Sequence, residues 1–209
     1  MEQIRDQEKL FIIMIGRSGC GKGTQSELII KYLEDKKNIK PKYISSGGAL
    51  RKFAQDSSHT AKKILEILNR GMLVPEFLMI RIWTNIFIES IGPDDSILID
   101  GGGRKILEAM VMGSAIDFYD YKNILVIYLD VSESWAKKRL VERGREDDRI
   151  AEYIERKMSW FEEDTTKCLE YYKTLCDRYR FLHIDGEKSV EDVHREIVSK
   201  MEAVVKTQN

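Results

Sequence analysis

Residues 16–24 read Gly16-Arg17-Ser18-Gly19-Cys20-Gly21-Lys22-Gly23-Thr24. The apolar run Leu10–Ile15 precedes them and is typical of a buried strand, and apolar residues at helical spacing follow them: Leu28, Ile29, Tyr32 and Leu33. Glycine accepts positive φ, so backbone N–H groups between a strand and a helix can turn toward one anion. The start of the helix adds partial positive charge, and Lys22 can reach the β- and γ-phosphates of a polyphosphate. The stretch therefore predicts a polyphosphate-binding loop.

The spacing of this loop is G-x-x-x-x-G-K, with one departure from the usual form. The residue after Lys22 is Gly23, and the hydroxyl follows one position later on Thr24. The alternative interpretation, a glycine-rich turn in an α/β domain, leaves Lys22 without a role. We therefore expect phosphate groups to bind at the end of the first strand.

The composition sets limits on the class of protein. A length of 209 residues suits one domain, and the formal net charge of −1 does not suggest a nucleic-acid partner. No apolar run approaches the ~20 residues that a membrane span needs. Met1–Lys9 is polar and contains no apolar signal-peptide core. We therefore expect a cytoplasmic protein without a membrane partner.

The cysteines and histidines predict neither a disulfide scaffold nor a metal cluster. The three cysteines are Cys20, Cys168 and Cys176, an odd number without a C-x-x-C pattern. We expect Cys168 and Cys176 to pack as small apolar residues in a helix, and Cys20 to be a small loop residue or a reactive thiol. The histidines are scattered along the chain: His59, His183 and His194.

Short apolar runs alternate with helical segments along the whole chain, which predicts a parallel sheet covered on both faces. The expected strands are Leu10–Ile15, Lys42–Ile44, Ile97–Asp100, Ile124–Leu129 and Tyr179–Ile184. Between the second and third strands we expect a long helical insert, Gly48–Ser90, with glycine-marked corners near Gly47 and Gly71.

Asp100 closes the third strand at the edge of the sheet where the phosphate loop closes the first. Ligands of such sheets bind outside the carboxyl ends of the strands, and an acidic residue beside a phosphate loop holds Mg²⁺ directly or through water. The Thr24 hydroxyl is the second expected metal ligand. The alternative is that Asp100 caps the next helix.

Six arginines lie near predicted strand ends and glycine corners: Arg51, Arg104, Arg139, Arg143, Arg145 and Arg156. Guanidinium groups complement the negative charge that phosphoryl transfer spreads over oxygen atoms. Each arginine taken singly is also compatible with a solvated helix face. Asp147 and Asp148 are expected to hold the arginines in the empty site, to stand in the first turn of a helix, or both.

From about Leu10 to Met201 the chain resembles the adenylate kinase family of nucleoside monophosphate kinases. The first segment, Gly16–Gln25, resembles a family loop that ends in G-K-G-T-Q. Five further segments follow in the order that the family has. Ser45–Arg51 resembles its S-T-G-D-L-L-R motif, Gly71–Pro75 its G-x-L-V-P motif, and Asp100–Arg104 its D-G-F-P-R motif. Arg143–Asp148 resembles the arginine-rich lid, and Ile184–Lys188 resembles the loop near the ATP base.

The resemblance implies an α/β fold of the P-loop NTPase type, with three layers and a five-stranded parallel sheet. It divides a single domain, 1–209, into a core of residues 1–45, 76–142 and 150–209, a helical insert at 46–75 that binds the nucleoside monophosphate, and a very short lid at 143–149 without zinc. It also implies a monomer that transfers a phosphoryl group reversibly from ATP, with Mg²⁺, to AMP.

The resemblance also assigns residues to roles. The catalytic residues would be Lys22, Arg104, Arg143, Arg145 and Arg156. The ATP-binding residues would be Gly16, Gly19, Cys20, Gly21, Lys22, Gly23, Thr24, Arg139, Arg143 and Lys188. The monophosphate-binding residues would be Ser46, Gly47, Arg51, Leu73, Val74, Arg104 and Glu108. Asp100 would order water around Mg²⁺.

Three departures from the family pattern affect the acceptor side. Gly102 and Gly103 replace Phe and Pro of D-G-F-P-R, which leaves Arg104 less preorganised and makes the turn either trans or strained. Gly48 replaces Asp, and Glu108 stands where a Gln reads adenine. An ionised Glu accepts hydrogen bonds but cannot donate to adenine N1, so it either faces guanine-like donors or faces solvent. The alternatives are therefore a kinase for UMP, CMP, GMP or a deoxynucleotide, or a nucleotide-binding regulatory module without turnover.

Overall fold

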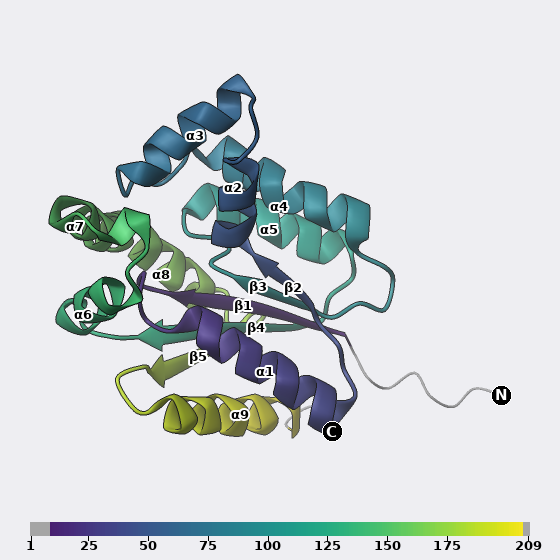
Figure 1. Cartoon of the computed structure of the whole chain (residues 1–209). Helices are drawn as coiled ribbons and strands as arrows, with labels where there is room; N and C mark the ends of the chain where they lie inside the picture. The colour runs from purple at the N-terminus through teal and green to yellow at the C-terminus, as the bar shows by residue number, and fades with distance from the viewer. Residues whose placement is uncertain (1–8, 207–209) are drawn as a thin grey trace.

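The computed structural model describes residues 9–206 and contains one parallel sheet with the strand order β2-β3-β1-β4-β5 (Figure 1). The strands are β1 (Leu10–Gly16), β2 (Lys42–Ser45), β3 (Ile97–Asp100), β4 (Asn123–Asp130) and β5 (Arg180–Asp185). All five predicted strands are present, although β5 begins at Arg180, one residue later than expected, and ends at Asp185. The predicted segment Met1–Lys9 falls, except for Lys9, outside the described residues, as do positions 207–209.

The central strand β1 explains why the sheet is covered on both faces. Every residue of β1 is buried, and successive side chains of a strand point to opposite faces. Leu10, Ile12 and Met14 pack on one side with α1 (Lys22–Lys37), α6 (Glu133–Arg143) and α9 (Val190–Lys206). Phe11 and Ile13 pack on the other with α4 (Glu76–Ser90), α5 (Ile106–Phe118) and α8 (Thr166–Thr174). The predicted three-layer α/β fold is confirmed.

The helices follow the strands in an alternating order. They are α1 (Lys22–Lys37), α2 (Ser46–Phe53), α3 (His59–Asn69), α4 (Glu76–Ser90), α5 (Ile106–Phe118), α6 (Glu133–Arg143), α7 (Ala151–Trp160), α8 (Thr166–Thr174) and α9 (Val190–Lys206). The predicted insert consists of three separate helices, α2 to α4, which share a small apolar core around Leu50, Ile64 and Val74. In Figure 1, α2 and α3 rise above the carboxyl edge of the sheet.

Two short helical turns interrupt the second half of the chain. The 3-10 helix η1 (Glu146–Asp148) joins α6 to α7, and the π-helix η2 (Phe161–Thr165) joins α7 to α8. Asp147 and Asp148 therefore lie in the single turn of η1, ahead of α7. None of the helices within residues 9–206 has the length and apolar character needed to cross a membrane.

Cys176 differs from its prediction. It follows α8 and is exposed, whereas Cys168 is buried in α8 and Cys20 is buried in the phosphate loop. All three cysteines are free thiols.

Candidate active site

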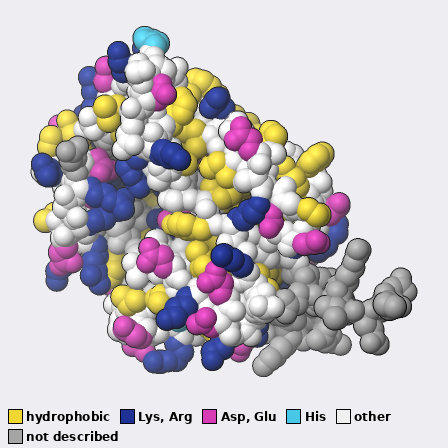
Figure 2. Space-filling view, turned by 45° about the vertical axis from the view of Figure 1, so that its right-hand side comes forward, with side chains coloured by type: hydrophobic (Ala, Val, Ile, Leu, Met, Phe, Trp, Pro, Cys, Tyr) yellow, Lys and Arg dark blue, Asp and Glu magenta, His cyan; other side chains and the backbone are white. Residues whose placement is uncertain are grey.

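A cavity of about 530 Å³ lies at the carboxyl ends of β1 and β3, between the insert and the segment that contains η1. Its lining combines the phosphate loop, the start of α1, residues 71–74 of the insert and basic side chains from α6 and α7. Figure 2 shows Lys and Arg side chains gathered where the surface is hollowed. The cavity thus has the charge and location expected for a phosphate-bearing ligand.

The phosphate loop holds its lysine in place through its own backbone. The Lys22 Nζ donates to the carbonyl oxygens of Gly16, at 2.7 Å, and Arg17, at 2.9 Å, and lies 3.5 Å from the Cys20 Sγ. Gly21 precedes α1 with a φ of +96°, a conformation that glycine adopts without strain. The loop therefore presents an ammonium group and a helix start to the cavity.

Asp100 ends β3 and lies beside the start of α1. Its Oδ2 accepts a hydrogen bond from the Tyr43 hydroxyl at 3.3 Å and is 4.0 Å from where a Cβ of Gly23 would stand. Burial and then the Asp100 charge raise the pKa of Tyr43 to about 12. The alternative role of Asp100 as a helix cap is wrong, because α5 begins at Ile106, six residues later.

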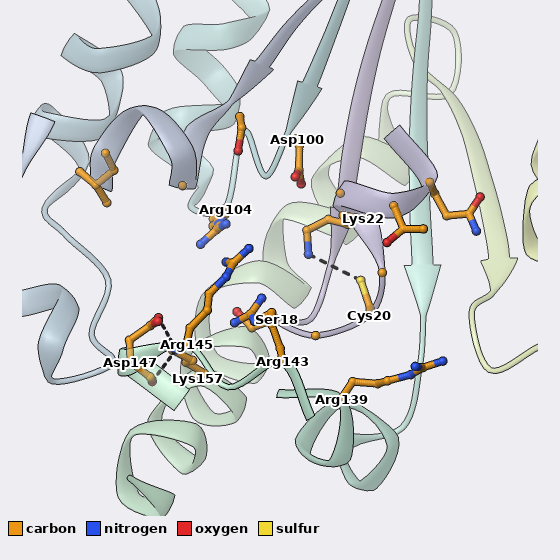
Figure 3. A pocket seen from close by; sticks show the side chains of 18 of the residues that line it. Ser18, Cys20, Lys22, Asp100, Arg104, Arg139, Arg143, Arg145, Asp147 and Lys157 are labelled. Carbon is orange, nitrogen blue, oxygen red and sulfur yellow. Dashed lines mark hydrogen bonds and ion pairs between the residues drawn. The ribbon is translucent and has the colours of Figure 1, made fainter. Parts of the chain in front are cut away.

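Three basic side chains point toward one space in the cavity, as Figure 3 shows for Lys22, Arg104 and Arg145. The pKa of Arg145 is lowered, mainly by burial and then by the positive charges of Arg143 and Arg51. The negative charges of Asp147 and Asp148 oppose this shift. An arginine stays charged under such conditions, so an anion in this space would be strongly attracted.

Asp148 organises the remaining cations. It is fully buried and accepts hydrogen bonds from Arg143 Nε and Nη2, at 2.8 and 2.7 Å, and from Lys157 Nζ at 2.7 Å. Lys157 also binds Asp147. Burial alone would raise the pKa of Asp147, but the hydrogen bond and charge of Lys157 and the charge of Arg143 outweigh it. The pKa of Asp147 therefore lies below its usual value. The expectation that these acids hold an arginine is confirmed for Asp148.

Sequence reasoning missed Lys157. This residue lies between the core-facing residues Ile154 and Met158 of α7 and is itself 6% exposed. A lysine on the apolar face of an amphipathic helix is the signal that could have identified it, because lysine is almost never buried without a partner.

Comparison with known proteins agrees with this geometry. A family model described as "Adenylate kinase" matches residues 14–176. The chain belongs to the adenylate kinase family. It is 32% identical to an adenylate kinase of Azobacteroides pseudotrichonymphae, over 92% of this chain and 97% of that protein. It is 33% identical to one of Encephalitozoon cuniculi, over 91% and 97%, and 29% identical to one of Prochlorococcus marinus, over 92% and 99%.

Members of the adenylate kinase family are phosphotransferases that act on ATP and AMP, so the resemblance in the sequence is confirmed, and with it the class of enzyme. Most residues that the resemblance assigns to a nucleotide line the cavity. On the ATP side these are Gly19, Cys20, Gly21, Lys22, Gly23, Thr24, Arg139, Arg143 and Lys188, and on the monophosphate side Gly47, Arg51, Leu73, Val74, Arg104 and Glu108.

Three assigned residues do not line the cavity. The Gly16 carbonyl accepts a hydrogen bond from Lys22. The side chain of Ser46 is buried. The neighbouring Ser45 caps α2, because its hydroxyl accepts a hydrogen bond from the Gly48 N–H. Arg156 lines a neighbouring depression, where it donates to the Arg70 carbonyl and pairs with Glu152. Arg156 thus connects α7 with the insert in this structure.

The Gly101–Arg104 turn is packed rather than loose. No cis peptide occurs within the described residues, and Gly103 has a φ of +63°. A Cβ at Gly103 would overlap the hydroxyl of the fully buried Tyr172. The Arg104 N–H donates to Glu108 at 3.2 Å, and the Arg104 carbonyl accepts from Thr165 at 3.3 Å. The backbone of Arg104 is thus hydrogen-bonded at both its N–H and its carbonyl, in a turn whose peptide bonds are trans.

Glu108 does not face solvent. Its side chain is 3% exposed, lines the cavity and caps the start of α5 through the Arg104 N–H. Burial raises the pKa of Glu108, and the N–H and charge of Arg104 oppose this rise. The interpretation of Glu108 as a solvated helix residue is therefore wrong.

Proposed function

We propose that the chain catalyses reversible transfer of the γ-phosphoryl group from ATP to AMP, which gives two ADP. The observation that carries this proposal is the convergence of Lys22, Arg104 and Arg145 on one cavity from three separate parts of the chain. A transferring phosphoryl group spreads its negative charge over several oxygens and needs cations on more than one side. A site for a single phosphate would not need this arrangement.

The proposed mechanism is direct in-line transfer without a covalent intermediate. Lys22 and the N–H groups at the start of α1 bind the phosphates of ATP, and Arg104 binds the phosphate of the acceptor. Arg145 neutralises charge between them. The protein lowers the barrier by holding the two substrates in line and by excluding water, which are the main means of catalysis in phosphoryl transfer.

The residues at the sheet edge are suited to Mg²⁺. One carboxylate, Asp100, and one hydroxyl, Thr24, line the cavity beside the phosphate loop, and Mg²⁺ usually takes one or two protein oxygens together with water and substrate phosphates. Within the described residues, no group of three or more His, Cys, Asp or Glu side chains forms a dedicated metal site. When bound, Mg²⁺ would neutralise charge on the phosphates of ATP.

Closure of the insert and the lid is the proposed means of excluding water. Arg156 of α7 already donates to the Arg70 carbonyl of the insert, and α3 contacts η1. Hinge residues at the ends of moving segments accommodate the change in backbone φ and ψ. We propose that the hinge residues here are Gly47, Gly48, Gly71 and Gly144. The division of the chain into core, insert at 46–75 and lid at 143–149 remains part of the proposal.

AMP is the proposed acceptor, and GMP is the second candidate. Leu73 and Val74 line the cavity and offer backbone groups to a base. The GMP candidate rests on Glu108, a buried carboxylate in the same lining, because a carboxylate accepts two donors such as guanine N1–H and N2–H₂. We also propose that the enzyme acts in the cytoplasm, where free thiols such as Cys20, Cys168 and Cys176 persist, and that it acts as a monomer.

A coupled assay of ADP formation over AMP, GMP, CMP, UMP and the deoxynucleotides tests this function. We expect the highest kcat/KM with AMP. A preference for GMP would change the acceptor and keep the mechanism. Binding of ATP without turnover of any acceptor would instead support the regulatory module.

A further inference from the structure

Arg17 belongs to the phosphate loop but does not line the cavity. Its side chain is 13% exposed and contacts residues that follow β4 and α7. There the Arg17 Nε donates to the Val131 carbonyl at 3.1 Å, the Nη2 pairs with Glu162, and the guanidinium carbon lies 4.3 Å from the centre of the Phe161 ring. These contacts connect the loop to the π-helix η2.

The same π-helix contacts the acceptor side of the cavity. The Thr165 hydroxyl, 1% exposed, donates to the Arg104 carbonyl, and the Arg104 guanidinium carbon lies 5.5 Å from the centre of the Trp160 ring. Trp160 immediately precedes η2, and Thr165 is its last residue. Six consecutive residues, Trp160 to Thr165, thus contact Arg17 and Arg104, two arginines that follow the ends of different strands.

The π-helical turn explains how one segment reaches both loops. The N–H of Thr166 bonds to the carbonyl of Phe161, five residues earlier, which is the bond of a π-helix. In this wider turn, side chains five residues apart point in similar directions from the helix axis. In an α-helix, with 3.6 residues per turn, they would lie on different faces. Trp160 and Thr165 therefore face Arg104 together, while Phe161 and Glu162 face Arg17.

Arg17 in turn affects the catalytic lysine. The Arg17 carbonyl accepts a hydrogen bond from the Lys22 Nζ at 2.9 Å. We infer that Arg17 and the π-helix η2 form a positioning unit, which sets the position of Lys22 relative to Arg104. Arg17 and Thr165 are positioning residues, because neither belongs to the lining of the cavity. The inference rests on the proposed function, since Lys22 and Arg104 bind the two substrates there.

Two substitutions test the unit from its two ends. Arg17→Met removes the contacts to Glu162 and Val131, and Thr165→Val removes the hydroxyl donor at constant shape. We expect each to lower kcat on the order of tenfold at saturating substrates, because small misplacements of reacting groups reduce transfer strongly. The conservative variants Arg17→Lys and Thr165→Ser should restore part of this loss. Arg195→Met and Thr174→Val are matched controls, since Arg195 is exposed and the exposed Thr174 donates its hydroxyl to the Tyr171 carbonyl within α8.

The double variant distinguishes one unit from two independent contacts. If Arg17 and Thr165 act through the same π-helix, the loss in Arg17→Met/Thr165→Val should be clearly smaller than the product of the single losses. A loss equal to that product would overturn the inference. So would single variants with unchanged kcat and a lowered melting temperature, because that result assigns these residues to stability alone.

A binding measurement keeps the test independent of turnover. The probe is a molecule in which a chain of phosphates joins two adenosines, and calorimetry compares its affinity with that of ATP. We expect Arg17→Met to lower the affinity for the double-ended probe about tenfold and the affinity for ATP by much less. Only the probe binds the ATP side and the acceptor side at once, so only its affinity depends on the relative position of the two sides. Equal weakening of both would contradict positioning. A wild-type chain that binds this probe but phosphorylates no acceptor would refute the proposed function without deciding against the positioning unit.

Discussion

Two glycine-rich turns, at the ends of the adjacent strands β1 and β3, form the two sides of the cavity, and they are stabilised in different ways. The lysine of the phosphate loop is held locally, since Lys22 donates to carbonyls only five and six residues away. The Gly101–Arg104 turn is held from a distance, since the Arg104 carbonyl bonds to Thr165, 61 residues along the chain, and Gly103 packs under Tyr172. A local motif can therefore be recognised in the sequence, whereas the second turn depends on the rest of the fold.

The largest expected effect separates function from stability in the phosphate loop. Lys22→Met should lower kcat on the order of 10³-fold, because it removes a cation that stabilises the transition state. The free energy of unfolding should stay within about 1 kcal/mol of the wild type, since the Lys22 ammonium fills no apolar space. Steady-state kinetics and urea unfolding measure the two quantities, with Lys31→Met on the exposed side of α1 as the control. Activity above about a tenth of the wild type would remove Lys22 from the transition state.

A matched pair of glycine substitutions compares the turns directly. Gly21 and Gly103 both have positive φ, but a Cβ at Gly21 would meet nothing within 4 Å, whereas one at Gly103 would overlap the Tyr172 hydroxyl. Gly21→Ala should therefore cost about 1–2 kcal/mol of stability, from backbone strain alone. Gly103→Ala should cost about 3 kcal/mol, because overpacking adds to the same strain.

The added cost at Gly103 can be tested by removing the obstacle. In Gly103→Ala/Tyr172→Phe the nearest atom of the ring would be 3.4 Å from the new Cβ, an ordinary contact. Urea unfolding should show that this double variant recovers about 1–2 kcal/mol relative to Gly103→Ala. Equal costs at Gly21 and Gly103, without recovery, would show that Tyr172 does not constrain the turn.

Glu108→Gln tests the acceptor side with a smaller effect. The amide oxygen of a Gln can still accept from the Arg104 N–H, and its NH₂ group adds a donor that a carboxylate lacks. We expect kcat/KM for AMP to rise roughly tenfold, equivalent to ~1.4 kcal/mol. The exposed Glu89→Gln on α4 is the control. An unchanged preference among acceptors would mean that Glu108 serves as a helix cap and does not contact the base.

The smallest expected effect is a pH dependence of stability at Glu108. Burial raises its pKa in the folded state, so the folded protein binds the proton more tightly than the unfolded chain. The contribution of Glu108 to stability is thus greatest below the usual carboxyl pKa and falls as the pH rises through the raised value. Urea unfolding should show Glu108→Gln gaining stability relative to the wild type from pH 4 to pH 7. A difference independent of pH would contradict the raised pKa.

Particular residues show what the sequence could predict. The strands were predictable because runs such as Leu10–Ile15 are apolar on both faces. The phosphate loop was predictable because its glycines and Lys22 lie within one short motif. Lys157, the partner of the buried Asp148, was missed because its role appears only when η1 folds against α7. Glu108 was left undecided because its burial depends on tertiary contacts, and nothing in the sequence indicated that a π-helix would contact Arg17 and Arg104.

The fate of the γ-phosphoryl group tests the central claim most directly. In a single-turnover experiment, ATP labelled at its γ-phosphate is mixed with excess enzyme, Mg²⁺ and AMP, and the products are separated. The account predicts that the label appears in the β-phosphate of ADP formed from AMP, and that with Lys22→Met it appears there on the order of 10³-fold more slowly. Label released as inorganic phosphate, or label retained in ATP while both nucleotides are bound, would contradict phosphoryl transfer between the two sides of this cavity.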